Sequence, residues 1–198
     1  MRKLMPLVLL GSMLLAPRAW PQAPADFRVA CHTTAGDFTL AIHRAWAPHA
    51  ADRFFALLGA HYYVGNAFYR VVPGFIVQWG LNPNPQVTAL WRRRIPDDPV
   101  RVSNTKGTIA FADAGRNTRT TVVFINLRDN RSLDKRGFVP FGQVVAGMDV
   151  LTQLDGSYGD SPPEGHGPDP RLILKYGAAY LTRDFPRLDV IYGCRVIP

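Results

Sequence analysis

The stretch FYRVVPGFIVQWG, residues 68–80, holds two short runs of β-branched and aromatic residues separated by a Pro-Gly pair. Such runs are typical of strands, and Pro-Gly marks a tight turn between them. The stretch therefore predicts an antiparallel pair of strands over residues 68–72 and 75–78. Because side chains alternate along a strand, Phe68, Arg70 and Val72 are expected to share one face.

Arg70 needs an explanation, because a cation among apolar neighbours is costly unless it is paired or solvated. It stands eight residues before Gln78, with the turn and Phe75 between them. Periodicity alone favours a structural arginine that is held by an acid across the sheet. A functional arginine is the second interpretation, and the residues by themselves leave both open.

Short strands recur on both sides of this pair. Alternating or apolar runs predict them at residues 27–32, 38–43, 108–111, 122–126, 139–144 and 188–196. Helices are predicted at residues 48–59 and 148–154, with a further helical turn at 178–183. The Gly-, Pro- and acid-rich segment 155–170 is expected to be a loop. This pattern indicates a mainly β fold, a closed or nearly closed barrel with two helices over its ends.

The N-terminus resembles a targeting signal. Arg2 and Lys3 precede an uncharged run over residues 4–16, which is short for a membrane span and typical of the apolar part of a signal peptide. Ala19 or Ala23 is the expected last residue of the signal. We predict a signal peptide over residues 1–19, or as far as 23, and one domain over residues 24–198; an uncleaved membrane anchor is the alternative.

Composition limits the partners. The chain has 198 residues, of which 47% are hydrophobic and 19% charged, which is typical of one globular domain. Its formal net charge is +8, but residues 92–94 form the only tight basic run, and no aromatic residues alternate with it. We expect no nucleic-acid partner, no membrane insertion once the signal is removed, and a monomer.

Metal and cofactor chemistry finds no support in the sequence. The five histidines do not pair with one another, with cysteine or with acids at the spacing of metal ligands. The serines lack a Gly-x-Ser-x-Gly frame, and no glycine-rich phosphate loop follows a predicted strand. We therefore predict that the protein needs neither a metal nor a cofactor.

Cys31 and Cys194 lie near the two ends of the exported chain. In an oxidising compartment an even pair of cysteines is a candidate disulfide. A bridge would close most of the domain into one loop, which stabilises by about 4–5 kcal/mol through the unfolded state. Two buried thiols on separate strands are the other interpretation, and the sequence leaves the choice open.

The stretch FYRVVPGFIVQWG, residues 68–80, resembles the signature of the cyclophilins, the peptidyl-prolyl cis/trans isomerases. Further similar motifs follow in the family's order: GTIAFADAGRNT at 107–118, VFIN at 123–126, Leu133-Asp134, and FGQVVAGMD at 141–149. The resemblance covers residues 27–196, and the C-terminal part is similar to exported bacterial members. It implies a closed eight-stranded antiparallel barrel capped by two α-helices.

The resemblance also implies a function. The chain is expected to catalyse rotation about X-Pro bonds, to bind proline-containing polypeptides and to assist the folding of exported proteins in the periplasm. Carried over by position, the catalytic residues are Arg70, Gln78 and Phe75. The substrate-binding residues are Ile76, Ala112, Asp113, Phe124, Leu133 and Phe138.

The sequence departs from the family pattern at several positions. Asp113 stands where asparagine is common, and Val122 stands where glutamine is usual, so one side-chain hydrogen bond is expected to be missing. Trp79 replaces a common glycine and is expected to narrow the groove or extend an apolar wall. Val122 and Trp79 motivate an alternative, a proline-peptide-binding or chaperone module with weak catalysis.

Overall fold

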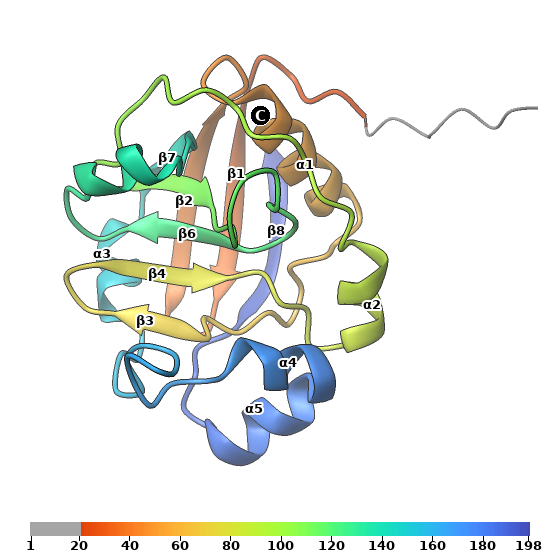
Figure 1. The fold of residues 1–198 in the computed structure, drawn as a ribbon, viewed down its shortest axis with the longest axis vertical. Coiled ribbons are helices and arrows are strands. Elements are labelled where there is room, and N and C mark those ends of the chain that lie inside the picture. Colours follow the sequence, from red (N-terminus) through yellow and green to blue (C-terminus); the bar gives the residue numbers. More distant parts are fainter. Residues whose placement is uncertain (1–20) are drawn as a thin grey trace, which may run out of the picture.

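A computed structural model describes residues 21–198 (Figure 1). The predicted signal peptide, residues 1–19, lies outside the described residues. The strands are β1 (Asp26–Thr33), β2 (Gly36–His43), β3 (Arg70–Val72), β4 (Ile76–Trp79), β5 (Thr108–Phe111), β6 (Val123–Asn126), β7 (Pro140–Ala146) and β8 (Ile191–Ile197). The helices are α1 (Pro48–Gly59), α2 (Pro85–Leu90), the 3-10 helix η1 (Arg131–Arg136), α3 (Met148–Gln153), α4 (Pro170–Tyr176) and α5 (Ala178–Asp184).

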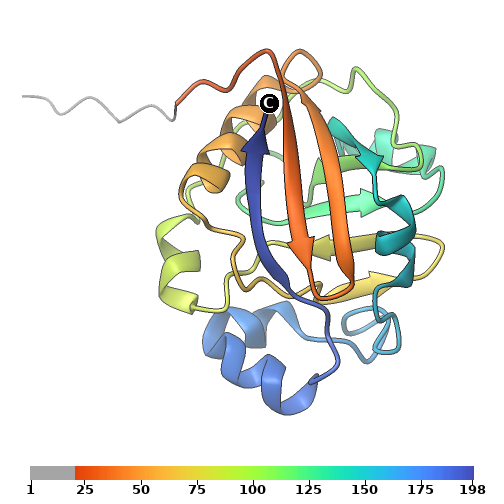
Figure 2. The ribbon, with the colours of Figure 1, turned by 180° about the vertical axis from the view of Figure 1, so that it is seen from behind.

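The strands form one curled antiparallel sheet in the order β3-β4-β6-β5-β7-β2-β1-β8. Figure 2 shows β8, β1 and β2 side by side on the far side of the molecule. The mainly β prediction with eight antiparallel strands is confirmed, but the predicted closure is wrong. β3 has only three residues and does not pair with β8. The segment before β3 meets the start of β8 through an isolated bridge between Ala67 and Val190 and a few backbone hydrogen bonds, so no strand ladder closes the sheet.

Alternation along the strands decides what is buried. On β2, Phe38, Leu40 and Ile42 point into the interior and are almost fully buried. Helix α1 packs against this interior, where the ring of Phe54 lies 5.2 Å from that of Phe141 on β7. Pro48 occupies its first turn, as predicted. The resulting core supports the short strands β3, β4 and β6 from one side and leaves their other face outward.

Helices α2, α4 and η1 were not predicted, so the two-helix prediction was incomplete. Helix α2 begins at Pro85 after the cap Asn84, and α4 begins at Pro170 after the cap Asp169. Both have six or seven residues, which is too short for a helical period to stand out. Helices α4 and α5 lie beneath β3 in Figure 1 and bury a small second core that includes Tyr69 and Ile173.

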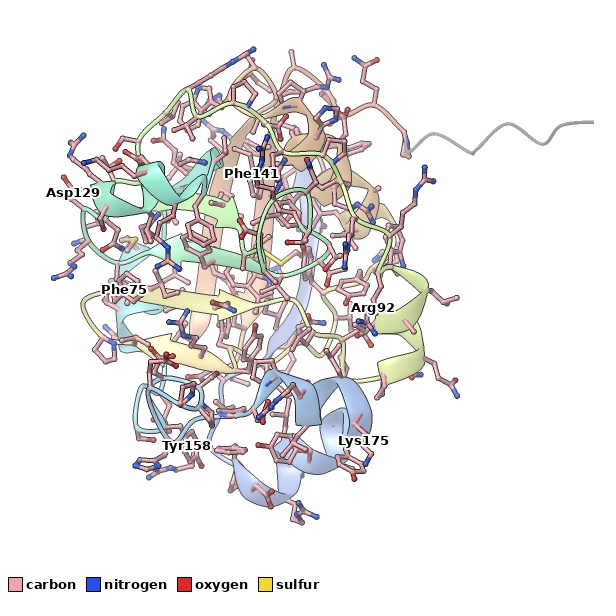
Figure 3. The ribbon with its side chains drawn as sticks, in the orientation of Figure 1. Phe75, Arg92, Asp129, Phe141, Tyr158 and Lys175 are labelled. Carbon is pink, nitrogen blue, oxygen red and sulfur yellow. A yellow bond between two sulfur atoms is a disulfide. The ribbon has the colours of Figure 1, made fainter. Side chains whose placement is uncertain are left out.

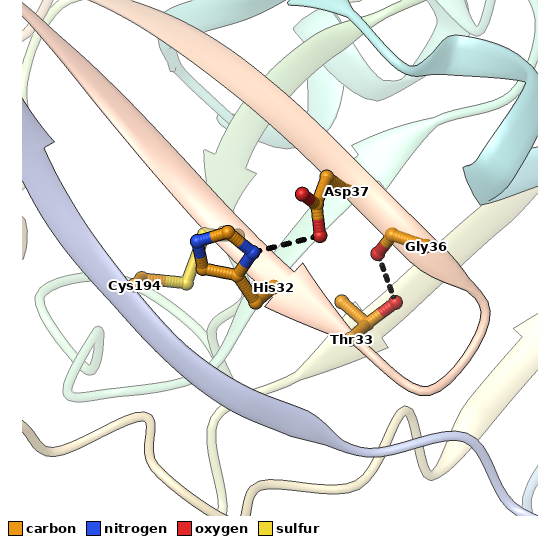
Figure 4. The surroundings of a disulfide bond; sticks show 6 residues. His32, Thr33, Gly36, Asp37 and Cys194 are labelled. Atoms are coloured by element: carbon orange, nitrogen blue, oxygen red, sulfur yellow. Dashed lines mark hydrogen bonds and ion pairs between the residues drawn. A yellow bond between two sulfur atoms is a disulfide. The ribbon is translucent and has the colours of Figure 1, made fainter.

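Cys31 on β1 and Cys194 on β8 lie directly opposite one another in the strand register, and a disulfide joins them (Figure 4). Of the two interpretations that the sequence left open, the structure has the bonded one. Nearby, His32 contacts Asp37 across the β1–β2 hairpin, and Thr33 donates a hydrogen bond to the Gly36 carbonyl. The disulfide therefore ties the C-terminal strand to the N-terminal one.

Other features of residues 21–198 bear on partners. None of their helices has the length and apolar character to span a membrane. No group of three or more His, Cys, Asp or Glu side chains in this part of the chain is arranged to hold a metal ion. The basic run at residues 92–94 is exposed after α2, where Figure 3 labels Arg92.

Candidate active site

The strand register builds one outward-facing row of side chains. Arg70 on β3 lies opposite Gln78 on β4, and Gln78 lies opposite Phe124 on β6. Residues directly opposite on neighbouring antiparallel strands share a face. The β3–β4 turn closes with a 2.9 Å bond from the Phe75 N–H to the Val72 carbonyl, and Gly74 has a φ of +68°. A proline followed by a glycine with a positive φ is typical of a type II turn.

The same alternation turns Trp79 inward. Its side chain is fully buried, and its ring lies 5.4 Å from that of Phe68, which is also in the interior. The expectation that Trp79 narrows the groove or extends its wall is therefore wrong. So is the expectation that Phe68 shares a face with Arg70, because β3 begins only at Arg70 and the chain before it does not continue the alternation.

A pocket of about 230 Å³ opens beside the outward row. Its lining contains all nine predicted site residues and Arg136: Arg70, Phe75, Ile76, Gln78, Ala112, Asp113, Phe124, Leu133, Arg136 and Phe138. Figure 3 shows Phe75 at the end of the β3–β4 hairpin, where the pocket begins. Residues from four separate parts of the sequence thus meet at one hollow on the outside of the sheet.

The pocket has an aromatic wall and a basic rim. Phe124 and Phe138 meet edge to face with their ring centroids 5.5 Å apart, a favourable arrangement for aromatic pairs. Leu133 on η1 packs with them and with Ile76. The guanidinium carbon of Arg136 lies 5.4 Å from the centre of the Phe138 ring, so this cation covers the outer end of the aromatic wall.

Buried asparagines hold the pocket walls, and sequence reasoning missed them. Asn130 donates to the Phe75 carbonyl at 2.9 Å, and Asn104 donates to the Phe138 carbonyl at 2.8 Å. Asn126 joins the two, since it donates to the Asn104 side chain and accepts from the Asn130 side chain. Buried polar groups are costly unless they are bonded in this way, so the network fixes the two phenylalanines.

Arg70 is held on two sides. Its Nε and Nη2 donate to the two carboxylate oxygens of Asp160 at 2.6 and 3.1 Å, and its Nη1 donates to Gln78 Oε1 at 2.9 Å. The guanidinium has five N–H groups, and these bonds use three of them. The acid that a structural arginine requires is therefore present, and an open pocket is present beside it.

Gln78 is oriented from its other end. Its Nε2 donates to the Tyr69 hydroxyl at 2.6 Å. Burial raises the pKa of Tyr69 to about 12, so this phenol stays neutral at physiological pH. Val122, where a glutamine was expected, packs against the small apolar core around Tyr69. The Tyr69 hydroxyl thus accepts the hydrogen bond of the Gln78 amide in a site that lacks the glutamine expected at position 122.

The sequence matches a known protein family over most of its length. The family model described as "Cyclophilin type peptidyl-prolyl cis-trans isomerase/CLD" matches residues 28–169. The chain belongs to the cyclophilin family. The predicted enzyme class, a peptidyl-prolyl cis-trans isomerase, is thereby confirmed, and α4, α5 and β8 lie beyond the matched region.

Relatives of this cyclophilin come from eukaryotes and bacteria. Peptidyl-prolyl cis-trans isomerase-like 3 of Dictyostelium discoideum is 31% identical over 131 residues, which cover 64% of this chain and 81% of the relative. Peptidyl-prolyl cis-trans isomerase A of Dickeya dadantii is 31% identical over 143 residues, 67% of this chain and 73% of the relative. A solved Cryptosporidium parvum cyclophilin shares the fold with a TM-score of 0.64 at 20% identity, covering 87% of this chain and 98% of that one.

The ion pair between Arg70 and Asp160 gives this cyclophilin a testable acid response. The hydrogen bond from Arg70 holds the pKa of the Asp160 carboxyl below its ordinary value. A carboxyl with a lowered pKa in the folded state adds stability above its unfolded pKa, near 3.9, and loses it as the pH falls through the folded value. We expect Asp160→Asn to lower the free energy of unfolding by about 1 kcal/mol relative to wild type at pH 5–8.

Below about pH 4 that difference is expected to shrink, because protonated Asp160 resembles the asparagine. Urea unfolding of both proteins at several pH values measures it. A difference that stays constant from pH 7 to pH 3 would contradict the prediction.

Proposed function

We propose that this cyclophilin is an exported enzyme that isomerises X-Pro bonds of proteins folding in the periplasm, with Arg70 as its central catalytic residue and Gln78 and Phe75 beside it. The observation that carries the proposal is the Arg70 guanidinium at the mouth of an open pocket, with two N–H groups that its bonds to Asp160 and Gln78 do not use. The pocket receives the proline ring, and the guanidinium meets the twisted amide.

The chemistry needs no bond to form or break. The barrier to amide rotation is about 18–20 kcal/mol because the nitrogen lone pair is delocalised into the carbonyl. In the twisted state the lone pair returns to the proline nitrogen. An N–H donor held at that nitrogen binds the twisted form better than either planar form, which is transition-state complementarity through preorganised electrostatics. Arginine suits the role because it is always charged and its donors have fixed geometry.

The pocket residues divide the remaining work. Phe124, Leu133 and Phe138, with Ile76, supply apolar surface for the pyrrolidine ring, which stays clamped while the carbonyl side rotates. Ala112 and Asp113 line the opposite edge and place backbone groups beside an extended peptide. A related Cryptosporidium parvum cyclophilin was crystallised in the presence of the dipeptide Ala-Pro, which supports proline-containing peptides as the substrate class.

One observation supports export, and another bears on where the signal is cleaved. The disulfide between Cys31 and Cys194 suits an oxidising compartment such as the periplasm. Ala23 is buried and its N–H donates to Asp52 at 2.9 Å, so cleavage after Ala19 would keep this contact and cleavage after Ala23 would remove it. N-terminal sequencing of the chain recovered from the periplasmic fraction tests both points. Recovery of the uncleaved chain from the cytoplasm would contradict the export proposal.

One observation favours the alternative of a binding or chaperone module with weak catalysis. Asp160 neutralises Arg70 directly, and a compensated cation stabilises developing electron density less than a bare one. The two functions separate in one experiment, in which peptide titration measures binding and exchange spectroscopy measures isomerisation by the same sample. Saturable binding without accelerated exchange would identify the binding module.

Phe138→Ala is expected to weaken binding of an Ala-Pro peptide about tenfold. Phe138 forms one aromatic wall of the pocket and is only half-buried, so the loss falls on the ligand more than on the core. Removing one aromatic contact of about 1.4 kcal/mol corresponds to that factor. Peptide titration by NMR measures it, with Tyr192→Ala, an exposed aromatic on β8, as the control. Equal affinity of the two variants would place the proline ring elsewhere.

A further inference from the structure

The loop between α3 and α4 lies against the β3–β4 hairpin and carries the acid that binds Arg70 (Figure 1). A Cβ added at Gly156 would lie 2.8 Å from the Pro73 ring, so the start of the loop packs directly on the hairpin turn. Asp160 follows four residues later and reaches Arg70 from outside the sheet. The active site is therefore completed by a segment that contributes no strand to it.

We propose that Asp160 is a positioning residue for Arg70, whose carboxylate fixes the plane of the guanidinium so that its two remaining N–H groups serve the substrate. This inference rests on the proposed function, in which Arg70 meets the twisted amide. It adds a residue to the site that lies ninety positions from Arg70 in the sequence and does not itself line the proline pocket.

The bond geometry supports positioning. Nε and Nη2 bind separate oxygens of one carboxylate, and two parallel bonds of this kind fix orientation as well as distance. Gln78 holds the third nitrogen from β4, so the guanidinium is bound from two elements. The side chains of Arg70 and Asp160 are 23% and 24% exposed, which leaves the pair less screened by solvent than a surface ion pair.

The loop is folded around Asp160. The Ser161 N–H donates to the Asp160 carboxylate at 2.7 Å, and the Gly167 N–H donates to the Asp160 backbone carbonyl at 2.7 Å. The Ser161 hydroxyl closes the loop by donating to the Pro168 carbonyl at 2.8 Å. A Cβ at Gly165 would lie 2.3 Å from the Asp160 carbonyl oxygen, so only glycine allows the loop to turn this tightly there. These hydrogen bonds and the tight turn hold Asp160 in a fixed position within the loop.

Removing the carboxylate has two opposing effects. It increases the net positive charge at the site, which favours catalysis, and it frees the long Arg70 side chain, which disfavours it. The proline nitrogen in the twisted state is a neutral acceptor that needs a donor at one place, so orientation outweighs net charge. A displacement of about 1 Å in a catalytic group can lower a rate about a hundredfold.

The test compares Asp160→Asn with Glu164→Gln, which removes the same charge from an exposed position of the same loop. Exchange spectroscopy of an Ala-Pro peptide measures catalysed isomerisation, and titration of the same peptide measures its affinity. Asp160→Asn is expected to lower the exchange rate about tenfold or more with less than about a threefold change in affinity. Glu164→Gln is expected to match wild type, and Asp160→Glu, which keeps the carboxylate, to recover part of the rate.

The Arg70 Nε–H resonance gives a second readout, because it reports whether residue 160 still holds the guanidinium in each variant. It is assigned by its absence in Arg70→Lys, and it is expected to be protected from solvent exchange in wild type and Glu164→Gln and unprotected in Asp160→Asn. If Asp160→Asn is poorly folded, Asp160→Glu decides: a rate that is recovered or lost together with the protected resonance supports positioning, and a folded Asp160→Glu that recovers only one of the two overturns it.

The remaining outcomes separate this inference from the proposed function. If Asp160→Asn equals or exceeds Glu164→Gln in rate while Arg70→Lys is impaired, positioning by Asp160 is overturned and the role of Arg70 stands. If Arg70→Lys retains the full rate, the proposed function of Arg70 itself is overturned, together with the inference that depends on it.

Discussion

Arg70→Lys is expected to lower catalysed cis/trans exchange about a hundredfold or more while the protein remains folded. Lysine carries the same charge on a single rotating ammonium, so it cannot bind Asp160 and Gln78 and still present fixed donors to the pocket. Removing one preorganised donor from a site of this kind costs about 10²–10³ in rate. A protease-coupled assay or exchange spectroscopy on an Ala-Pro peptide measures the loss.

Arg28→Lys on β1 is the matched control, because it makes the same exchange at an exposed position toward the other end of the sheet order. It is expected to keep the wild-type rate. Circular dichroism and thermal unfolding establish that both variants are folded. An Arg70→Lys protein that is folded and as active as Arg28→Lys would rule out a guanidinium-centred mechanism.

The outward row of the site was predictable because it depends on local pattern. A Pro-Gly turn sets the β3–β4 hairpin, and the hairpin register alone places Gln78 opposite Arg70. The order of the family motifs then supplies Phe124 on β6 and Leu133 on η1. Trp79 was misplaced because its position was judged from the glycine that relatives carry there, whereas strand alternation turns it inward once Gln78 faces out.

Other features follow from contacts between distant segments. Asp160 is an acid in a Gly- and Pro-rich loop, and no periodicity or spacing connects it with Arg70. Tyr69 immediately precedes β3, where the strand pattern has not begun, so alternation gives no reason for its hydroxyl to reach Gln78. The open sheet was unpredictable for a related reason, since a count of strands does not say whether the two strands at the ends of the sheet order, β3 and β8, pair with each other.

The short helices are a different case, because their signals were present in the sequence. Asn84 before Pro85 and Asp169 before Pro170 are each a capping residue followed by a proline in the first turn, a common start of a helix. Their apolar residues are too few to show a helical period. Capping signals therefore deserve weight of their own where a helix is only two turns long.

Loss of the disulfide is expected to have the largest effect on stability. Cys31→Ala with Cys194→Ala should lower the free energy of unfolding by about 5 kcal/mol, because the bond closes a loop between residues 163 apart in sequence and restricts the unfolded chain accordingly. Alanine avoids placing a hydroxyl at Cys31, which is fully buried. Urea unfolding of the oxidised wild type and of the double variant measures the difference.

The single variant Cys31→Ala tests the cause. Either substitution breaks the disulfide. If the loop constraint is the cause of the stabilisation, the single variant is therefore expected to lose nearly as much unfolding free energy as the double variant. β8 lies at one end of the sheet order and forms its described strand ladder with β1. It is therefore the strand that loss of the disulfide is expected to destabilise most. The pocket lies on β3, β4 and β6 with the segments around them, and isomerisation well below the unfolding transition is therefore expected to survive. A destabilisation below about 1 kcal/mol would show that sheet pairing, and not the disulfide, retains the C-terminal strand.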